Sequence, residues 1–451
     1  MPSYPRRSAK ISPARRIAFE ILKRVTIEEA YASNLLASHL TAKLSNEDRA
    51  LTHEIVMGVL RYQRLLDHLL TGLLARNLAR LDEEVLLALR IGLYQLKYLT
   101  RIPAHAIVNE SVQLVRMSGK SSAASLVNAV LRKAAQSSNN PSTVVPDNTV
   151  AATSLSLSHP DWLLARWADR YGLVSASALA QANNQPAPLS FRLNLLIASR
   201  TEILATITRA GLAVLPSMLV KDAYRLTNGN GRTLLELAAQ GLIHIQDEAS
   251  QLVATLVDAQ PGLRVLDVCA APGGKTTALA MHMENRGLII AGDLHISRVK
   301  LIQENAARLG AKIIHSLCFN AAITLPLAAL GSFDRVLVDA PCTGTGTLRR
   351  NPEIKWRLTP EKINEMANLQ LRILDNCAPL VAKGGRLVYS TCSLEEEEDE
   401  SVIRKFLAMH SEFALYTDLP AALCTTTGLL RTWPQRDDCD GFFAAILVKK
   451  S

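Results

Sequence analysis

Residues 264–276 read RVLDVCAAPGGKT, a short apolar stretch followed by a loop of small residues and glycines. We interpret this as a strand that leads into a ligand loop, because paired glycines let the backbone approach a ligand before the next helix begins. The loop has neither the G-x-G-x-x-G spacing of dinucleotide-binding folds nor the G-x-x-x-x-G-K of a P-loop. The stretch therefore indicates an α/β fold, and it disfavours a nicotinamide-dependent enzyme.

Strands and helices alternate from about residue 246 to the end of the chain. This order implies a mostly parallel sheet with helices on both faces, in which ligands bind at the carboxyl ends of the strands. The expected strands are RVLDVCA (264–270), GLIIAGD (287–293), AKIIHSL (311–317), FDRVLVDA (333–340), GGRLVYST (384–391) and GFFAAILVK (441–449).

The rest of the chain is organised differently. Residues 1–140 show apolar side chains at helical spacing and predict an all-helical domain. Residues 141–158 are rich in Ser, Asn, Pro and Thr, and we interpret them as a linker. Residues 159–240 predict a small α+β domain, with helices at 159–172 and 199–212 and a strand within 188–196. Residues 241–451 then form the α/β domain.

The charge is concentrated in one part of the sequence. The 451-residue chain has a net charge of +9, and residues 1–140 hold 20 Lys and Arg against 11 Asp and Glu, so the remainder is neutral. A basic surface on one domain favours a polyanionic partner such as nucleic acid.

The seven cysteines include no Cys-x-x-Cys pair, and we expect no metal site. Without an apolar span or a signal segment, we expect a cytoplasmic protein and no membrane partner.

An acidic residue ends the second expected strand. Asp293 lies 18 residues after Lys275, where a carboxylate can accept hydrogen bonds from a ribose diol. A glycine loop and such a carboxylate together suggest an adenosyl ligand without a pyrophosphate. A helix N-cap is the alternative role for Asp293.

Two cysteines follow neighbouring strands and fall on the same edge of the sheet. Cys342 follows the fourth strand, three residues after Asp339, and Cys392 follows the fifth. A thiolate that adds to carbon 6 of cytosine turns the ring into an enamine, which makes carbon 5 nucleophilic. Asp339 can supply the hydrogen bond or proton at ring nitrogen 3, and Lys275 is a candidate to favour the thiolate. The residues alone do not rank the two cysteines.

These segments resemble the RNA cytosine-5 methyltransferase family. The resemblance rests on CAAPGGKT, on DAPC followed by TGTGTLRRNP, and on YSTCSLEEEEDE, with QDEAS (246–250) and DCDGFF (438–443) in addition. It implies a seven-stranded methyltransferase fold with an antiparallel last strand, and S-adenosylmethionine as the cofactor. It also implies that Cys392 attacks the base and that Cys342 assists product release.

The resemblance assigns a cofactor site. Asp293 would hold the ribose, and Asn320 stands where relatives carry an acid near the adenine, so its role is open. We also place Asp339 at this site. The residues of the cofactor loop are Cys269, Ala270, Ala271, Pro272, Gly273, Gly274 and Lys275.

The N-terminal region resembles the RNA-binding NusB fold through SPARRIAFEIL, IPAHAIVNESVQLV and SLVNAVLRK. A NusB-like domain ahead of such a methyltransferase implies small-subunit (16S) ribosomal RNA as the partner. The same chemistry on tRNA or on another rRNA cytosine is an alternative. A more distant one is an RNA-binding antitermination or assembly factor with a vestigial catalytic domain. DNA is not expected, because DNA enzymes use the Pro-Cys thiol and need no Thr-Cys-Ser cysteine.

Overall fold

The computed structural model describes residues 11–74, 77–137, 149–324, 327, 330–419, 423–425 and 428–450. The chain divides into two compact units: unit 1 is Met1–Gln185 with Leu348–Arg357, and unit 2 is Pro186–Thr347 with Leu358–Ser451. The segment Leu348–Arg357 therefore belongs to unit 1, although the residues on both sides of it belong to unit 2.

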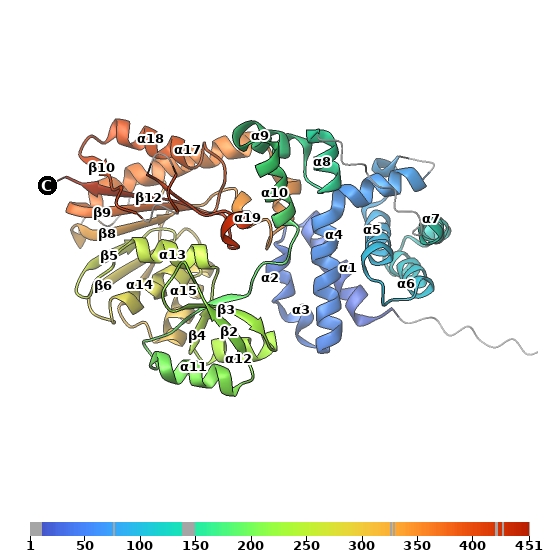
Figure 1. Cartoon of the computed structure of the whole chain (residues 1–451), viewed down its shortest axis with the longest axis horizontal. Coiled ribbons are helices and arrows are strands. Elements are labelled where there is room, and N and C mark those ends of the chain that lie inside the picture. Colours follow the sequence, from blue (N-terminus) through green and yellow to red (C-terminus); the bar gives the residue numbers. More distant parts are fainter. Residues whose placement is uncertain are drawn as a thin grey trace, which may run out of the picture. The chain divides into compact units, whose positions relative to one another are not determined.

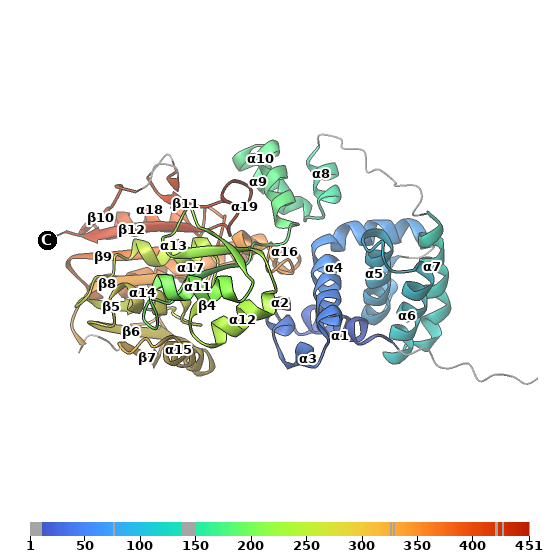
Figure 2. The same ribbon diagram turned by 60° about the horizontal axis from the view of Figure 1, so that its bottom comes forward.

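Within its described residues, the regular structure of unit 1 is helical. Helices α4, α5, α6 and α7 lie side by side in both views (Figures 1 and 2), around a core in which Ile55, Leu89 and Leu114 are fully buried. The elements are α1 (Pro13–Ile27), α2 (Ala32–Leu36), α3 (His39–Ala42), α4 (Asn46–Leu73), η1 (Leu78–Arg80), α5 (Glu83–Tyr98), α6 (Ala104–Met117), η2 (Ser121–Ala123), α7 (Ala124–Ser137), α8 (Val150–Ser156), α9 (Asp161–Tyr171), α10 (Leu173–Asn183) and α16 (Ile354–Arg357).

Unit 1 extends beyond the region that the sequence predicts as a helical domain. Residues 149–158 are the described part of the expected linker, and they contain α8. Helices α9 and α10, which we placed in the small α+β domain, are grouped with unit 1. One physical reason is that the guanidinium of Arg64 in α4 donates to the carbonyl of His159 and to Asp161. The limits of the domains stay a proposal.

Unit 2 begins with a small antiparallel sheet in the order β2-β3-β1-β4. Phe191 of its central strand and Ile203 of α11 are buried in the cluster that joins this sheet to its helices. The sequence predicts β1 and α11 but not the other strands. The elements are β1 (Ser190–Leu193), α11 (Arg200–Arg209), β2 (Ala213–Pro216), β3 (Ala223–Asn228), α12 (Gly231–Ala239) and β4 (Ile243–Ile245).

The larger sheet of unit 2 has the order β10-β12-β9-β8-β5-β6-β7, and β11 also pairs with β12. Strands β5 to β9 are parallel, whereas β12 is antiparallel to both of its neighbours β9 and β10. The strands are β5 (Arg264–Asp267), β6 (Leu288–Asp293), β7 (Ile314–Cys318), β8 (Phe333–Asp339), β9 (Val381–Thr391), β10 (Phe413–Leu415), β11 (Leu430–Arg431) and β12 (Phe443–Lys449).

Helices cover both faces of this sheet, and alternate side chains of each strand enter two different cores (Figure 1). Val265 and Ile289 pack with α13 and α14, whereas Leu266 and Ile290 pack with α17 and α18. The remaining elements are α13 (Glu248–Leu256), α14 (Gly274–His282), α15 (Ile296–Leu309), η4 (Thr345–Thr347), α17 (Pro360–Cys377), η5 (Ala378–Leu380), α18 (Glu400–Met409) and α19 (Pro434–Asp437).

The predicted fold class is confirmed: a helical N-terminal part, a small α+β part, and an α/β sheet with an antiparallel last strand. The strand order reverses at β5, because β6 and β7 extend the sheet on one side of it and β8 and β9 on the other. Ligands of such sheets bind at this reversal, outside the carboxyl ends of the strands. No helix among the described residues is long and apolar enough to cross a membrane.

Candidate active site

A cavity of about 400 Å³ lies at the carboxyl ends of β5, β6, β8 and β9. The topology brings these four ends together because β5 pairs with β6 and β8, and β8 pairs with β9. Seven of the residues predicted from the sequence line the cavity, and they are Cys269, Ala271, Asp293, Asn320, Asp339, Cys342 and Cys392.

The glycine loop lies between β5 and α14. At Gly273, φ is +100°, and a Cβ atom would be 3.2 Å from the backbone of Ile302 in α15, so both the turn and the packing favour glycine. Asn305 and Arg298 of α15 donate to the carbonyls of Pro272 and Ala271, at 2.9 and 3.0 Å. Helix α15 thus holds the loop from one side.

The other loop residues border a second, smaller space. Ala270, Pro272, Gly274 and Lys275 line an adjacent cavity of about 180 Å³, which Cys269, Ala271 and Asp339 also border. Gly273 lines neither of the two cavities. Burial raises the pKa of the Cys269 thiol well above its ordinary value, so this cysteine is protonated at neutral pH.

Asp293 ends β6 with its side chain almost fully buried. Its Oδ1 accepts a hydrogen bond of 3.2 Å from the backbone of His295, and its Oδ2 lies 3.5 Å from the guanidinium of Arg298. Asn320 lies in the loop after β7, where its Oδ1 accepts from the backbone of Ala322 at 2.9 Å. Both side chains border the larger cavity.

The two rim thiols are in direct contact. The Sγ atoms of Cys342 and Cys392 are 3.2 Å apart, at hydrogen-bond distance for sulfur, and both cysteines are free and half-buried. The contact with Cys392, followed by burial, raises the pKa of Cys342 well above its ordinary value. Cys342 is therefore a neutral thiol that can donate its S–H to the sulfur of Cys392.

Asp339 is held by two donors. The Lys275 ammonium donates to Oδ2 at 2.7 Å, and the hydroxyl of Ser390 donates to Oδ1 at 2.8 Å. The Lys275 Nζ also lies 5.0 Å from the centre of the Phe442 ring. The structure thus places the Lys275 ammonium against the carboxylate, and among the described residues Lys275 makes no hydrogen bond to a thiol.

Sequence reasoning missed Glu398, which lies in the run EEEE after Cys392 and reads as a solvated charge run. Its side chain is fully buried, and burial raises its pKa. The carboxylate accepts from the backbone N–H of Thr343 at 2.8 Å, from Ser393 Oγ at 2.8 Å and from Gln370 Nε2 at 3.0 Å, and also from the Thr343 hydroxyl. One buried acid therefore joins the loops that carry Cys342 and Cys392.

A second connection fixes the backbone of Cys392. The Gly346 N–H donates to the Cys392 carbonyl at 2.9 Å, and the Gly346 carbonyl accepts from Gly441 at 2.8 Å. A Cβ atom on Gly346 would lie 1.9 Å from the Gly441 oxygen. The segments that contain Gly346 and Gly441 thus fix the position of the Cys392 backbone. Among the described residues, no group of His, Cys, Asp and Glu is arranged to hold a metal ion.

Comparison with known proteins shows that the chain is a methyltransferase and gives its family. Residues 254–448 match the model of the family described as 16S rRNA methyltransferase RsmB/F. Residues 12–136 match the NusB family, and residues 159–231 match the ferredoxin-like domain of RsmF/B-like methyltransferases.

Similar proteins match along nearly the whole chain. The chain is 37% identical over 450 residues to the probable ribosomal RNA small subunit methyltransferase B of Bacillus subtilis strain 168, and the match covers 98% of this chain and 100% of that protein. It is 33% identical to ribosomal RNA small subunit methyltransferase B of Yersinia pseudotuberculosis serotype O:1b, with 97% and 98% covered. The crystal structure of PH0851 is 29% identical with a TM-score of 0.84, and 98% and 99% are covered. The chain belongs to the 16S rRNA methyltransferase RsmB/F family.

Proposed function

We propose that this chain transfers the methyl group of S-adenosylmethionine to carbon 5 of one cytosine in 16S ribosomal RNA. The observation that carries the proposal is the pair of thiols 3.2 Å apart, in the same cavity as Asp293. A nucleophile for the base and a carboxylate for a ribose therefore face one space. The substrate rests on the relatives, which are named for the RNA of the small ribosomal subunit.

The residues of the cavity fit S-adenosylmethionine. Asp293 Oδ2 has the Arg298 contact at 3.5 Å and retains the capacity to accept a ribose hydroxyl. Phe319 and Pro341 supply apolar walls for an adenine ring, and Asn320 supplies a polar group at the same wall. S-adenosylmethionine would supply an electrophilic methyl group at this site.

Cys392 is the proposed nucleophile. Its sulfur forms a bond to carbon 6 of cytosine, and the electrons of the 5,6 double bond move toward carbon 5, which then takes the methyl group. Because the neighbouring Cys342 keeps its proton and can donate it in a hydrogen bond, the sulfur of Cys392 is the one whose negative charge is stabilised.

Asp339 is the proposed partner of the base. Its carboxyl group would hold the edge of the cytosine ring that includes nitrogen 3, and stabilise the charge that develops there when the thiolate adds. Lys275, 2.7 Å from Oδ2, can supply the proton that this carboxyl group passes to the ring. From the sequence alone, Lys275 is a candidate to favour the thiolate. We now propose that Lys275 acts through Asp339 instead.

Cys342 is the proposed residue for release. After methyl transfer a base removes the proton on carbon 5, the double bond re-forms as the bond from carbon 6 to Cys392 breaks, and the proton on nitrogen 3 returns to Asp339. A thiol at hydrogen-bond distance from the departing sulfur stabilises it as it leaves.

The direct test uses the purified full chain with 16S rRNA, with small ribosomal subunits from a strain that lacks the enzyme, and with tRNA. Each RNA is incubated with methyl-labelled S-adenosylmethionine and digested to nucleosides. We expect label in 5-methylcytidine at one position of 16S rRNA. Label confined to tRNA would contradict the substrate, and label on another atom or base would contradict the chemistry.

A further inference from the structure

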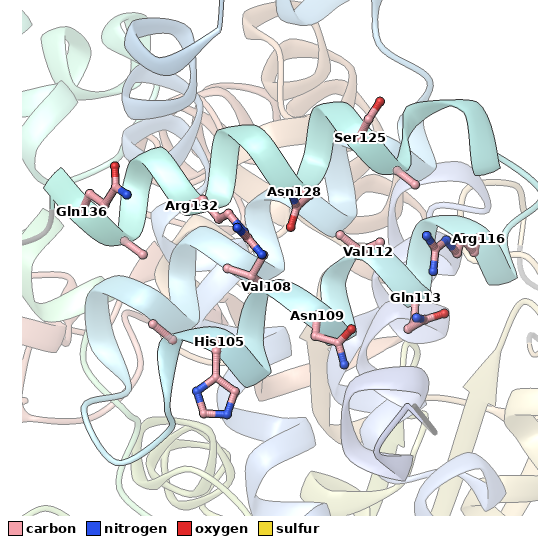
Figure 3. Close-up of a pocket in the computed structure, with 13 residues that line it drawn as sticks. His105, Val108, Asn109, Val112, Gln113, Arg116, Ser125, Asn128, Arg132 and Gln136 are labelled. Atoms are coloured by element: carbon pink, nitrogen blue, oxygen red, sulfur yellow. The ribbon is translucent and has the colours of Figure 1, made fainter. Parts of the chain in front are cut away.

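A long groove runs between α6 and α7 of unit 1, outside the proposed active site. Its volume is about 990 Å³, and all of its lining residues come from these two helices. Figure 3 shows the helices antiparallel, with His105 to Arg116 running one way and Ser125 to Gln136 the other. We propose that this groove binds a single-stranded segment of the RNA substrate, an inference that rests on the proposed function.

Eight of the 13 residues that line the groove are polar, and none is acidic. Arg116 and Arg132 contribute the positive charge, and four amide side chains also line the groove, those of Asn109, Gln113, Asn128 and Gln136. Figure 3 shows Asn128 and Arg132 pointing from α7 toward α6. Polyanions bind where cations are not neutralised by neighbouring carboxylates, so a groove free of Asp and Glu is suited to phosphates.

The one acid on the two helices that form the groove already has partners. Glu110 is the one acid in α6, and its carboxylate accepts from Ser12 and from Arg15 of α1. Helix α7, ASLVNAVLRKAAQS, has no Asp or Glu. In the described part of the chain, neither Arg116 nor Arg132 makes an ion pair or a side-chain hydrogen bond. Their guanidinium groups are therefore available to a ligand.

The fold does not need these polar side chains in its core. Asn128, Arg132 and Gln136 are spaced four residues apart and form one stripe on α7, whereas Val127 and Leu131 are fully buried on a different stripe, about 100° around the helix. Among the described residues these three side chains make no hydrogen bond or ion pair with the rest of the protein, as is common for residues that contact a ligand.

A single strand fits the chemistry better than a duplex. Amide groups can hydrogen-bond base edges, which an A-form duplex hides in its deep groove but a single strand exposes. The floor of the groove includes Val108 and Val112, which are buried and can contact the faces of bases or riboses. The exposed ring of His105 at one end can stack on a base.

The test is a salt titration of RNA binding by the full chain, followed by fluorescence anisotropy. The probes are a labelled single-stranded oligoribonucleotide and the duplex formed with its complement. We compare the wild type with Arg116→Glu/Arg132→Glu and with Lys43→Glu/Arg80→Glu. The second variant makes the same change of net charge at exposed residues of unit 1 outside the groove.

We expect the groove variant to bind the single strand at least tenfold more weakly than the Lys43→Glu/Arg80→Glu control. A plot of the logarithm of the association constant against the logarithm of the salt concentration should become shallower. The magnitude of its slope should decrease by about 1.4, as the loss of two phosphate contacts implies. Asn128→Ala should weaken binding without a change of slope, because it removes no charge. Equal losses in the two double variants, or an equal loss for duplex and single strand, would overturn the proposal.

The experiment distinguishes failure of the groove proposal from failure of the proposed function. Cofactor affinity, measured by calorimetry, should be the same in all variants. If the wild type methylates cytosine and the groove variant binds RNA like the control, the groove proposal fails and the function stands. If the wild type forms no 5-methylcytidine although the groove variant loses RNA, only the proposed function fails.

Discussion

At the scale of single residues, Asp293 is the side chain on which the proposed cofactor site depends most. Its carboxylate is almost fully buried, yet each oxygen has a single weak contact, at 3.2 Å to His295 and at 3.5 Å to Arg298. A buried carboxylate with acceptor capacity to spare is expected where a ligand completes its hydrogen bonds.

Asp293→Ala should therefore weaken S-adenosylmethionine binding. Loss of a charge-assisted hydrogen bond of about 1.5–3 kcal/mol raises the dissociation constant roughly tenfold or more. Isothermal calorimetry measures the change directly, and Asp293→Asn should fall between wild type and Asp293→Ala. Unchanged affinity in the alanine variant would mean that Asp293 only caps the start of the following helix.

Glu398 is predicted to position both thiols without touching the base. Glu398→Ala leaves the donors of Thr343, Ser393 and Gln370 without their common acceptor. We expect at least a tenfold loss of kcat, since each buried group left unpaired costs about 1–3 kcal/mol. Cofactor affinity should be unchanged.

Glu398→Gln is the matched control. Its amide oxygen can still accept from the N–H groups, and the hydroxyls of Thr343 and Ser393 can turn to accept from its NH₂ group. The glutamine variant should therefore recover most of the activity. A glutamine variant as impaired as the alanine variant would show that the charge of Glu398, and not its hydrogen bonding, matters.

At the scale of elements, the Cys392 loop is held by the backbone of a neighbouring segment. Gly346→Ala would place a methyl group 1.9 Å from the Gly441 oxygen and 2.9 Å from the Cys392 oxygen. Because backbone atoms on both sides must move, we expect a large loss of kcat and a lower melting temperature. Gly72→Ala is the control, because nothing lies within 4 Å of a Cβ at that position; it should be neutral or stabilising by up to about 1 kcal/mol. Full activity in Gly346→Ala would contradict this role.

Elements with a clear period were predictable from the sequence. All six strands expected in the α/β part are present, because long apolar runs between turn signals have few other structures. The strands β2, β3, β4, β10 and β11 were missed. Strand β2 is largely exposed, and β4, β10 and β11 have only two or three residues each, so none of these four shows a hydrophobic period. The common cavity of Asp293, Asp339, Cys342 and Cys392 also follows from strand order and the carboxyl-end rule.

The burial of Glu398 could not be predicted from the sequence. A run of four glutamates indicates a solvated surface, and only tertiary structure shows that Glu395 and Glu398 are buried whereas Glu396 and Glu397 are not. The 3.2 Å contact of the two thiols likewise depends on side-chain placement at the ends of two strands, which a motif does not specify.

At the scale of the whole molecule, the segment Leu348–Arg357 links the two units along the chain. It packs within unit 1, although the residues before and after it belong to unit 2. Lys355 is buried and donates to the Arg61 carbonyl at 2.9 Å, and the Trp356 indole donates to the Leu60 carbonyl at 2.7 Å. Arg357 donates to the carbonyls of three residues, Val25, Glu29 and Ala30. Unit 1 therefore holds a segment that begins six residues after Cys342.

Deletion of residues 1–140 should therefore do more than weaken RNA binding. It removes the backbone carbonyls that accept from Lys355, Trp356 and Arg357. The truncated chain must therefore expose Lys355, which the intact chain buries, or leave it with Asn184 as its remaining acceptor. We expect reduced solubility and a broadened melting transition, measured by size-exclusion chromatography and circular dichroism. A truncated chain that is monodisperse and binds S-adenosylmethionine with native affinity would contradict this expectation.

The central claim is the division of labour between the two thiols, and a denaturing gel tests it most directly. Full-length Cys342→Ala is incubated with substrate RNA and S-adenosylmethionine. It retains the attacking Cys392 but loses assistance in release, so we predict a slow-migrating covalent protein–RNA band that depends on the cofactor. Cys392→Ala and the double variant should show neither band nor methylation. A covalent band in Cys392→Ala, with Cys342→Ala inactive and free of adduct, would reverse the two roles and contradict the account.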